Sequence, residues 1–230
     1  MEFFETKIIE IVKETSDSYS FKMEIPEGFH WEAGQYTMWK FKDHQVEEGD
    51  RPVRIFTIAS APEDGYLMFT TRIEEKHSSW KDILLNKLQV GDGMLVADAK
   101  GEFNFHKEYD ESFVIAGGIG ITPIRSLLKH YSENNNPEHK LVVLYSDDRG
   151  EFCYQDDFKD ITDNMPNLEL RYISDRNEFS ASVKEYAKEK QNDVEYLIAG
   201  SPGMNKFFSG ILEEEGVDPA NIKIDNFMGY

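Results

Sequence analysis

The sequence has one cysteine, few basic residues and no long apolar run. Cys153 alone cannot form an internal disulfide, a thiolate zinc site or the ligand set of an iron–sulfur cluster. The 25 Lys and Arg residues face 44 Asp and Glu residues, so a net charge of −19 makes nucleic acid an unexpected partner. The six histidines show no ligand spacing, so no metal site is expected. No apolar stretch reaches roughly 18 residues, and the N-terminus lacks a signal-peptide pattern. We therefore expect a cytoplasmic protein without a membrane span.

Two hydrophobic patterns divide the 230 residues. Before residue 108, short runs alternate with period two between Gly, Pro and Asp turns, which predicts strands over 4–9, 20–25, 36–41, 55–58 and 66–73. A helix capped by Ser78 or Ser79 follows, and we expect it to cover one mouth of a small closed antiparallel barrel.

After residue 107 the pattern becomes strand, turn and helix. Apolar strands are predicted over 112–116, 140–146, 168–173, 194–199 and 222–225, with helices over 123–131, near 156, over 182–190 and over 203–214. This alternation favours a parallel sheet covered on both faces. We therefore predict two domains, 1–107 and 108–230.

The strongest local motif runs from Phe113 to Pro123. An apolar strand enters three glycines, Thr122 is a candidate N-cap, and Pro123 suits the first helical position. Free backbone N–H groups and the helix dipole at such a turn suit a pyrophosphate. A second turn, Gly200–Met204, follows another apolar strand and could face the first across one cleft. The alternative interpretation is that both are tight, well-capped turns that bind nothing.

In the barrel half, Arg54 lies on a predicted strand beside aromatic and hydroxyl side chains. Alternation sends Arg54, Phe56 and Ile58 to one side and Ile55, Thr57 and Ala59 to the other. The guanidinium suits a bidentate phosphate contact, although a half-buried strand with a solvated arginine explains the same composition.

Four segments in this order resemble the ferredoxin-NADP reductase superfamily over nearly the whole chain. They are Arg54–Thr57, Ser78–Trp80 with the later Val90–Asp92, Gly117–Pro123, and Gly200–Met204 with the terminal Asp225–Tyr230. The resemblance implies an N-terminal six-stranded antiparallel flavin-binding barrel and a C-terminal five-stranded parallel α/β nucleotide-binding domain.

The resemblance also implies roles for individual residues. Arg54 would hold the flavin pyrophosphate, Phe56 would lie against the flavin, and Thr57, Asp225 and Phe227 would lie at the reactive ring. The wider set implied to hold the flavin comprises Ile55, Ser60, His77, Ser78, Ser79 and Trp80. The set implied for the dinucleotide comprises Gly118, Gly120, Ile121, Thr122, Pro123, Asp147, Gly200, Ser201, Pro202, Gly203 and Met204. Ser60 stands where relatives that use only FMN tend to have Asn, so FAD is favoured over FMN.

The sequence departs from the family pattern at three places. Phe56 replaces a Tyr, and Ala199 stands where many relatives have Cys beside the nicotinamide. Asp147 and Asp148 follow the second strand of the predicted sheet, where they would accept hydrogen bonds from a free ribose 2′-OH, so NADH is expected to be preferred over NADPH. Adjacent Arg149 could reverse that preference.

The leading hypothesis is a flavin-dependent NAD(P)H oxidoreductase that passes electrons to a separate acceptor. Candidate acceptors are a ferredoxin, a flavodoxin, an oxygenase component, free flavin or a ferric chelate. The first alternative is a non-catalytic flavin- or nucleotide-binding subunit of a larger complex. A plain NAD-dependent dehydrogenase is the second alternative. It would give the barrel half no role, and the sequence shows no proton-transferring His or Tyr–Lys pair.

Overall fold

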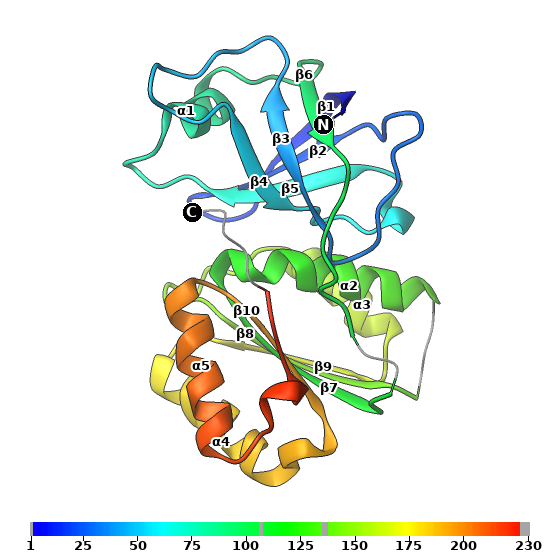
Figure 1. Ribbon diagram of the computed structural model, residues 1–230, viewed down its shortest axis with the longest axis vertical. Helices are drawn as coiled ribbons and strands as arrows, with labels where there is room; N and C mark the ends of the chain where they lie inside the picture. The colour runs from blue at the N-terminus through cyan, green and yellow to red at the C-terminus, as the bar shows by residue number, and fades with distance from the viewer. Residues whose placement is uncertain (1, 106–107, 135–137, 226–230) are drawn as a thin grey trace. The chain divides into compact units, whose positions relative to one another are not determined.

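The computed structural model describes residues 2–105, 108–134 and 138–225. It divides the chain into an N-terminal unit that ends at Glu102 and a C-terminal unit that begins at Phe103 (Figure 1). This division falls five residues before the boundary that the change of sequence pattern predicted. Each unit has its own sheet, and each is described by itself below.

The N-terminal unit is a six-stranded antiparallel barrel. Its strands are β1 (Phe3–Lys13), β2 (Ser18–Met23), β3 (Tyr36–Phe41), β4 (Val53–Thr57), β5 (Leu67–Arg72) and β6 (Gly93–Ala97). The sheet order is β4-β3-β6-β1-β2-β5, and a 2.7 Å bond from the amide of Ala59 to the carbonyl of Met68 joins its two ends. The predicted six-stranded barrel is confirmed. Alternation missed β6 because this strand lies in the middle of the sheet and is largely buried on both faces.

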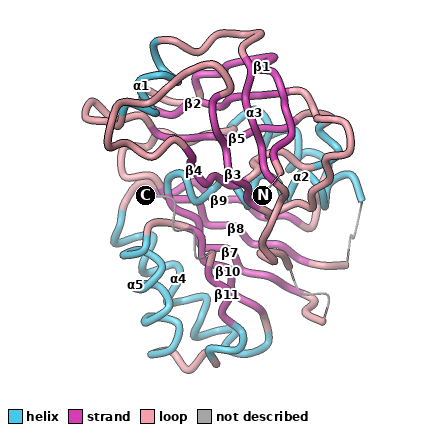
Figure 2. The backbone as a smooth tube through the Cα atoms, turned by 45° about the horizontal axis from the view of Figure 1, so that its top comes forward, coloured by secondary structure: helices cyan, strands magenta, loops and turns pink. Residues whose placement is uncertain are grey.

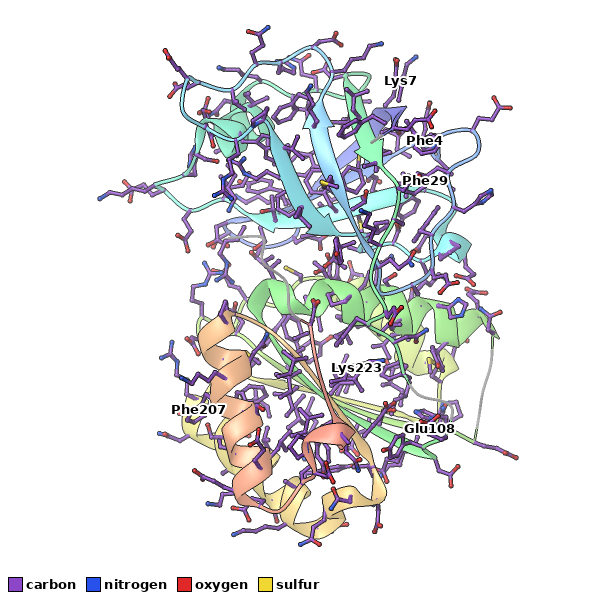
Figure 3. All side chains as sticks on the ribbon, in the orientation of Figure 1. Phe4, Lys7, Phe29, Glu108, Phe207 and Lys223 are labelled. Atoms are coloured by element: carbon purple, nitrogen blue, oxygen red, sulfur yellow. The ribbon has the colours of Figure 1, made fainter. Side chains whose placement is uncertain are left out.

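Aromatic rings fill the barrel. Phe69 stacks on Phe56 at 5.0 Å and on Phe21 at 5.1 Å between ring centroids, and it contacts Trp39 at 4.9 Å. At the edge of the unit, Phe4 packs edge-on against Phe29 at 5.5 Å (Figure 3). These contacts bury large apolar areas, which is the main source of stability for so small a core.

Helix α1 (Ser79–Asn86) packs on this barrel core, as predicted. It buries Trp80, Ile83 and Leu84, and the Trp80 ring lies 4.6 Å from that of Phe41. Ser78 is the N-cap, since its hydroxyl accepts a 3.3 Å bond from the amide of Lys81.

The C-terminal unit contains the predicted five-stranded parallel sheet. Its strands are β7 (Glu111–Gly117), β8 (Lys140–Ser146), β9 (Leu168–Ile173), β10 (Glu195–Ala199) and β11 (Ile222–Ile224), and their order is β11-β10-β7-β8-β9 (Figure 2). Figure 1 shows α2 (Ile121–Asn134) and α3 (Gln155–Asn164) on one face, and α4 (Arg176–Lys190) and α5 (Pro202–Glu214) on the other. The parallel α/β fold is therefore confirmed.

The strand order makes β7 and β10 neighbours, although a long stretch of chain separates them. From β7 the sheet grows through β8 and β9 on one side and through β10 and β11 on the other. This pair is the topological switch point, at which the carboxyl ends of the strands bind ligands in open α/β sheets. Both glycine turns of the sequence follow these two strands.

The start of helix α4 differs from the sequence prediction. Helix α4 begins at Arg176 rather than at 182, because the carboxylate of Asp175 accepts bonds of 2.8 Å from the amides of Asn177 and Glu178. In the described residues, no helix has the length and apolar character needed to cross a bilayer. The same residues contain no cluster of three potential metal-ligating side chains.

Candidate functional site

The first glycine turn leads from β7 directly into a helix. Residues Gly118–Gly120 form a 3-10 turn, and Gly118 has a φ of 54°, a conformation that favours glycine. The expectation that Thr122 is the N-cap was wrong. Helix α2 already begins at Ile121, and the Thr122 hydroxyl donates a 2.9 Å bond to the carbonyl of Ile119. Pro123 consequently lies in the first turn, where its missing N–H costs no helical bond.

The second glycine turn lies against the first. A Cβ on Gly120 would lie 2.1 Å from the Ala199 carbonyl oxygen and 2.7 Å from the Gly200 nitrogen. The Met204 sulfur would lie 2.2 Å from a Cβ on Gly117 and 2.4 Å from one on Gly200. Only glycine permits this approach, so the structure brings together the two turns that the sequence singled out.

Helix α5 begins within this second turn. Ser201 is its N-cap and accepts a 3.3 Å bond from the amide of Met204, while Pro202 is the first helical residue and Gly203 the second. The N-termini of α2 and α5 thus both lie at the switch point. Backbone donors and the positive ends of two helix dipoles at one place suit an anionic ligand.

Asp147 follows the end of β8, the strand beside β7. It is 6% exposed, and its Oδ1 accepts a 3.0 Å bond from the amide of Arg149 while lying 3.5 Å from that residue's Nε. Asp148 points elsewhere and pairs with Arg176. The Arg149 side chain therefore faces the Asp147 carboxylate, which we expect to bind the ribose.

Asp225 follows β11, at the same end of the sheet. Its amide donates a 2.8 Å bond to the Ile198 carbonyl, and its own carbonyl accepts a 3.1 Å bond from Asn205 Nδ2. Burial raises the pKa of the Asp225 carboxyl to about 6. The sequence analysis missed Asn205, whose buried Oδ1 accepts no hydrogen bond within the described part of the chain. Phe227, also predicted to act at the reactive ring, lies outside the described residues.

In the barrel unit, Arg54 lies beside the N-terminus of α1. Its guanidinium carbon is 5.8 Å from the Trp80 ring, and its side chain is 18% exposed. Nη1 donates to the carbonyls of Arg51 and Val53, and Nη2 donates to Asp50. The structure therefore places the predicted phosphate-binding arginine next to the predicted phosphate-binding helix.

Sequence analysis missed Asp50, which joins these two elements. Its Oδ2 accepts bonds of 2.7 Å from the Ser79 hydroxyl and 3.0 Å from the Trp80 amide, and its Oδ1 accepts from Arg54 and from the Arg51 amide. Burial alone would raise the pKa of Asp50, but the bonds from Ser79, Arg54 and the two amides outweigh it and hold the pKa well below its ordinary value. No motif marked this residue, because it precedes the strand in a polar loop.

The remaining predicted flavin-site residues lie on β4, shortly after it, or just before α1. Phe56 is 6% exposed and packs on Phe69, so a ligand reaches little of its ring. Thr57 is 6% exposed and pairs with Tyr36 of β3. The other positions are as follows: Ile55 is half-buried on β4, Ser60 is buried with its carbonyl accepting from Trp31, and His77 Nδ1 lies 2.6 Å from the Glu74 carbonyl. Their roles at a flavin stay predictions.

Comparisons with known proteins agree with this geometry. Residues 114–210 match the family model of the oxidoreductase NAD-binding domain. The chain is 29% identical to one component of the Na(+)-translocating NADH-quinone reductase of Haemophilus influenzae (strain PittEE), in an alignment that covers 90% of this chain and 55% of that component. The chain thus spans about half the length of this relative.

Two solved structures share the fold. The FAD/NAD binding domain of nitric oxide dioxygenase from Vibrio cholerae aligns with a TM-score of 0.78 at 17% identity, covering 97% of this chain and 98% of that one. The ferredoxin-NADP+ reductase of Plasmodium falciparum aligns with a TM-score of 0.78 at 16% identity, covering 97% and 96%. At these identities the likeness establishes the fold.

A closed barrel followed by a parallel sheet with two glycine turns at its switch point is the fold that this chain shares with these structures, and its second half matches an oxidoreductase NAD-binding domain. The Vibrio cholerae neighbour is named for binding FAD and NAD, a flavin and a nicotinamide coenzyme of the kinds that the sequence resemblance implies. The fold that the resemblance to the ferredoxin-NADP reductase superfamily implied is confirmed.

Proposed function

We propose that the protein takes a hydride from NADH to a flavin held by the barrel unit and passes the electrons to a separate acceptor. The observation that carries this proposal is the contact of Gly120 with the Ala199–Gly200 backbone at the switch point. That contact brings two helix N-termini together, and helix N-termini supply the backbone donors that a dinucleotide pyrophosphate needs. A turn that only connects a strand to a helix does not require two backbone segments to lie this close together.

The residues of the C-terminal unit fit a dinucleotide. Gly118 has the positive φ that this tight turn requires, and Gly120 lets the two turns lie against each other, so backbone amides of both turns come together where the phosphates would bind. The turn from Gly200 to Met204 would bracket the nicotinamide end. A bound flavin supplies the two-electron chemistry, so the protein has to supply position and charge. No general acid is needed for hydride transfer itself.

The barrel unit offers a matching set of donors for the flavin phosphates. Arg54, the Ser79 hydroxyl and the first-turn amides of α1 lie together, although Asp50 accepts hydrogen bonds from several of them. A guanidinium beside a helix N-terminus is suited to a pyrophosphate, which favours FAD as the flavin.

NADH rather than NADPH is the proposed donor. Arg149 contacts Asp147, and Arg176 pairs with Asp148, so both guanidinium groups face carboxylates. Carboxylates at the end of this strand repel a ribose 2′-phosphate. Comparing kcat/KM for the two coenzymes tests this preference, and a tenfold advantage for NADPH would refute it.

The proposed acceptor is a small molecule or a protein without a strong negative charge. With a net charge of −19, this protein repels acidic electron carriers. The name of the relative, a component of an NADH-quinone reductase, suggests a quinone as one such acceptor. Reduction assays with quinones, ferric chelates, free flavin and carrier proteins would separate these possibilities. A cytoplasmic location is likewise part of this proposal.

The deciding experiment is an absorption spectrum of the protein reconstituted with FAD, recorded before and after anaerobic addition of NADH. If the protein has the proposed function, it will show a flavin absorption spectrum, and NADH will bleach it. Two observations favour the alternative function, a flavin-binding subunit without turnover of its own: Phe56 is buried, and Arg54 donates a hydrogen bond to Asp50. That alternative expects a yellow protein that neither coenzyme bleaches.

A further inference from the structure

The donors of Arg54 are directed at the protein's own oxygens. Nη2 donates to Asp50, and Nη1 donates to the carbonyls of Arg51 and Val53. The Asp50 and Arg54 side chains are each only 18% exposed. A phosphate that binds this guanidinium bidentately must therefore replace contacts that already exist.

The N-terminal turn of α1 is satisfied in the same way. The amide of Trp80 donates to Asp50 at 3.0 Å, that of Lys81 to the Ser78 hydroxyl at 3.3 Å, and that of Asp82 to the Ser78 carbonyl at 2.9 Å. The Asp50 carboxylate is thus an anion at the positive end of the helix dipole. It accepts from the arginine and from the helix at once, as a phosphate would.

Lys81, in the first turn of α1, lies among charges of both signs. Burial lowers the pKa of Lys81, and the positive charges of Arg54 and Arg72 lower it further, while Glu74 and Asp17 act in the opposite sense. Arg72 lies 3.5 Å from Asp17, whereas Arg54 contacts Asp50 directly, so Arg54 is the cation that this carboxylate neutralises.

We propose that Asp50 is an internal substitute for a flavin phosphate, which an incoming flavin nucleotide must displace from Arg54 and α1. This inference rests on the proposed function and adds that the flavin is an exchangeable ligand. Two anions cannot share one guanidinium and one helix end without repulsion, so binding and the Asp50 contacts are in competition. Flavin without a phosphate does not compete for these donors.

The test is the affinity of the apoprotein for FAD and for riboflavin, measured by titration of the flavin fluorescence with wild type and Asp50→Asn. The asparagine side chain keeps an oxygen that can accept from Trp80, so the helix cap is retained. Asp50→Ser provides a second variant of the same kind. Asp175→Asn is the matched control, because Asp175 caps α4 and its replacement changes net charge equally.

We expect Asp50→Asn and Asp50→Ser to tighten FAD binding by about tenfold, which corresponds to about 1.4 kcal/mol. Riboflavin affinity should stay unchanged in both, and Asp175→Asn should alter neither affinity. Inorganic pyrophosphate should raise the melting temperature of the Asp50 variants more than that of wild type. This readout is independent of flavin chemistry.

Three results would overturn the inference. Equal or weaker FAD binding by the Asp50 variants would show that the carboxylate orients Arg54 for the ligand rather than competing with it. A parallel gain for riboflavin would show that the effect does not act through the phosphate. Absence of binding of any flavin by wild type and variants would instead refute the proposed function, and the inference with it.

Discussion

Gly120→Ala tests the contact on which the candidate site depends. The added methyl group would lie 2.1 Å from the carbonyl oxygen of Ala199 and 2.4 Å from its carbon, distances that real Cβ atoms do not show. All three nearest atoms belong to the backbone at the end of β10. No side-chain rotation can relieve the clash, so the two turns must separate by roughly 1 Å.

The expected cost follows from this geometry. Overpacking of a well-packed region costs about 1–3 kcal/mol, and a purely backbone clash belongs at the upper end. For a chain of this size, about 3 kcal/mol lowers the melting temperature by roughly 6–12 °C. NADH binding should weaken as well, because the separated turns no longer present their amides together.

Two other glycines provide matched controls for the thermal melts. At Gly117 the new methyl meets the Met204 side chain, which can rotate away, so Gly117→Ala should cost less than Gly120→Ala. At Gly210 nothing lies within 4 Å, and alanine inside α5 should stabilise by up to about 1 kcal/mol. If Gly120→Ala melted with the wild type while Gly210→Ala behaved as expected, the close approach of the two turns would be refuted.

Three further predictions concern other parts of the molecule. Because the folded-state pKa of Asp225 is raised to about 6, the stability of the wild type should fall as pH rises from about 4 to 6. In urea denaturation, Asp225→Asn should not show this fall and should be more stable than the wild type by up to about 3 kcal/mol at pH 7.5. Parallel pH profiles of stability for the two proteins would contradict this prediction. Phe69→Ala, which removes a fully buried ring stacked on two others, should cost about 3–5 kcal/mol, and a loss below about 1 kcal/mol would mean the barrel core is packed differently. Asp147→Asn should shift the kcat/KM ratio towards NADPH by about tenfold, and an unchanged ratio would place the ribose elsewhere.

The sequence by itself determined the two-part organisation and the locations of the glycine turns. Period-two alternation is a local signal of half-buried strands, and glycine after an apolar strand is a local signal of a tight turn, so both could be recognised without tertiary contacts. Strand β6 could not be recognised in this way because burial on both faces removes the alternation. The beginning of α2 was misjudged because the hydroxyl of Thr122 bonds a carbonyl of the preceding turn instead of an amide of the helix.

Only the tertiary structure decided which residues meet. The pairing of β7 with β10 brings Gly120 to the backbone of Ala199, and no local pattern encodes that strand order. Asp50 is an ordinary loop residue until folding places its carboxylate between Arg54 and the first turn of α1. Electrostatic contacts of this kind depend on distances between segments remote in sequence, so the fold alone sets them.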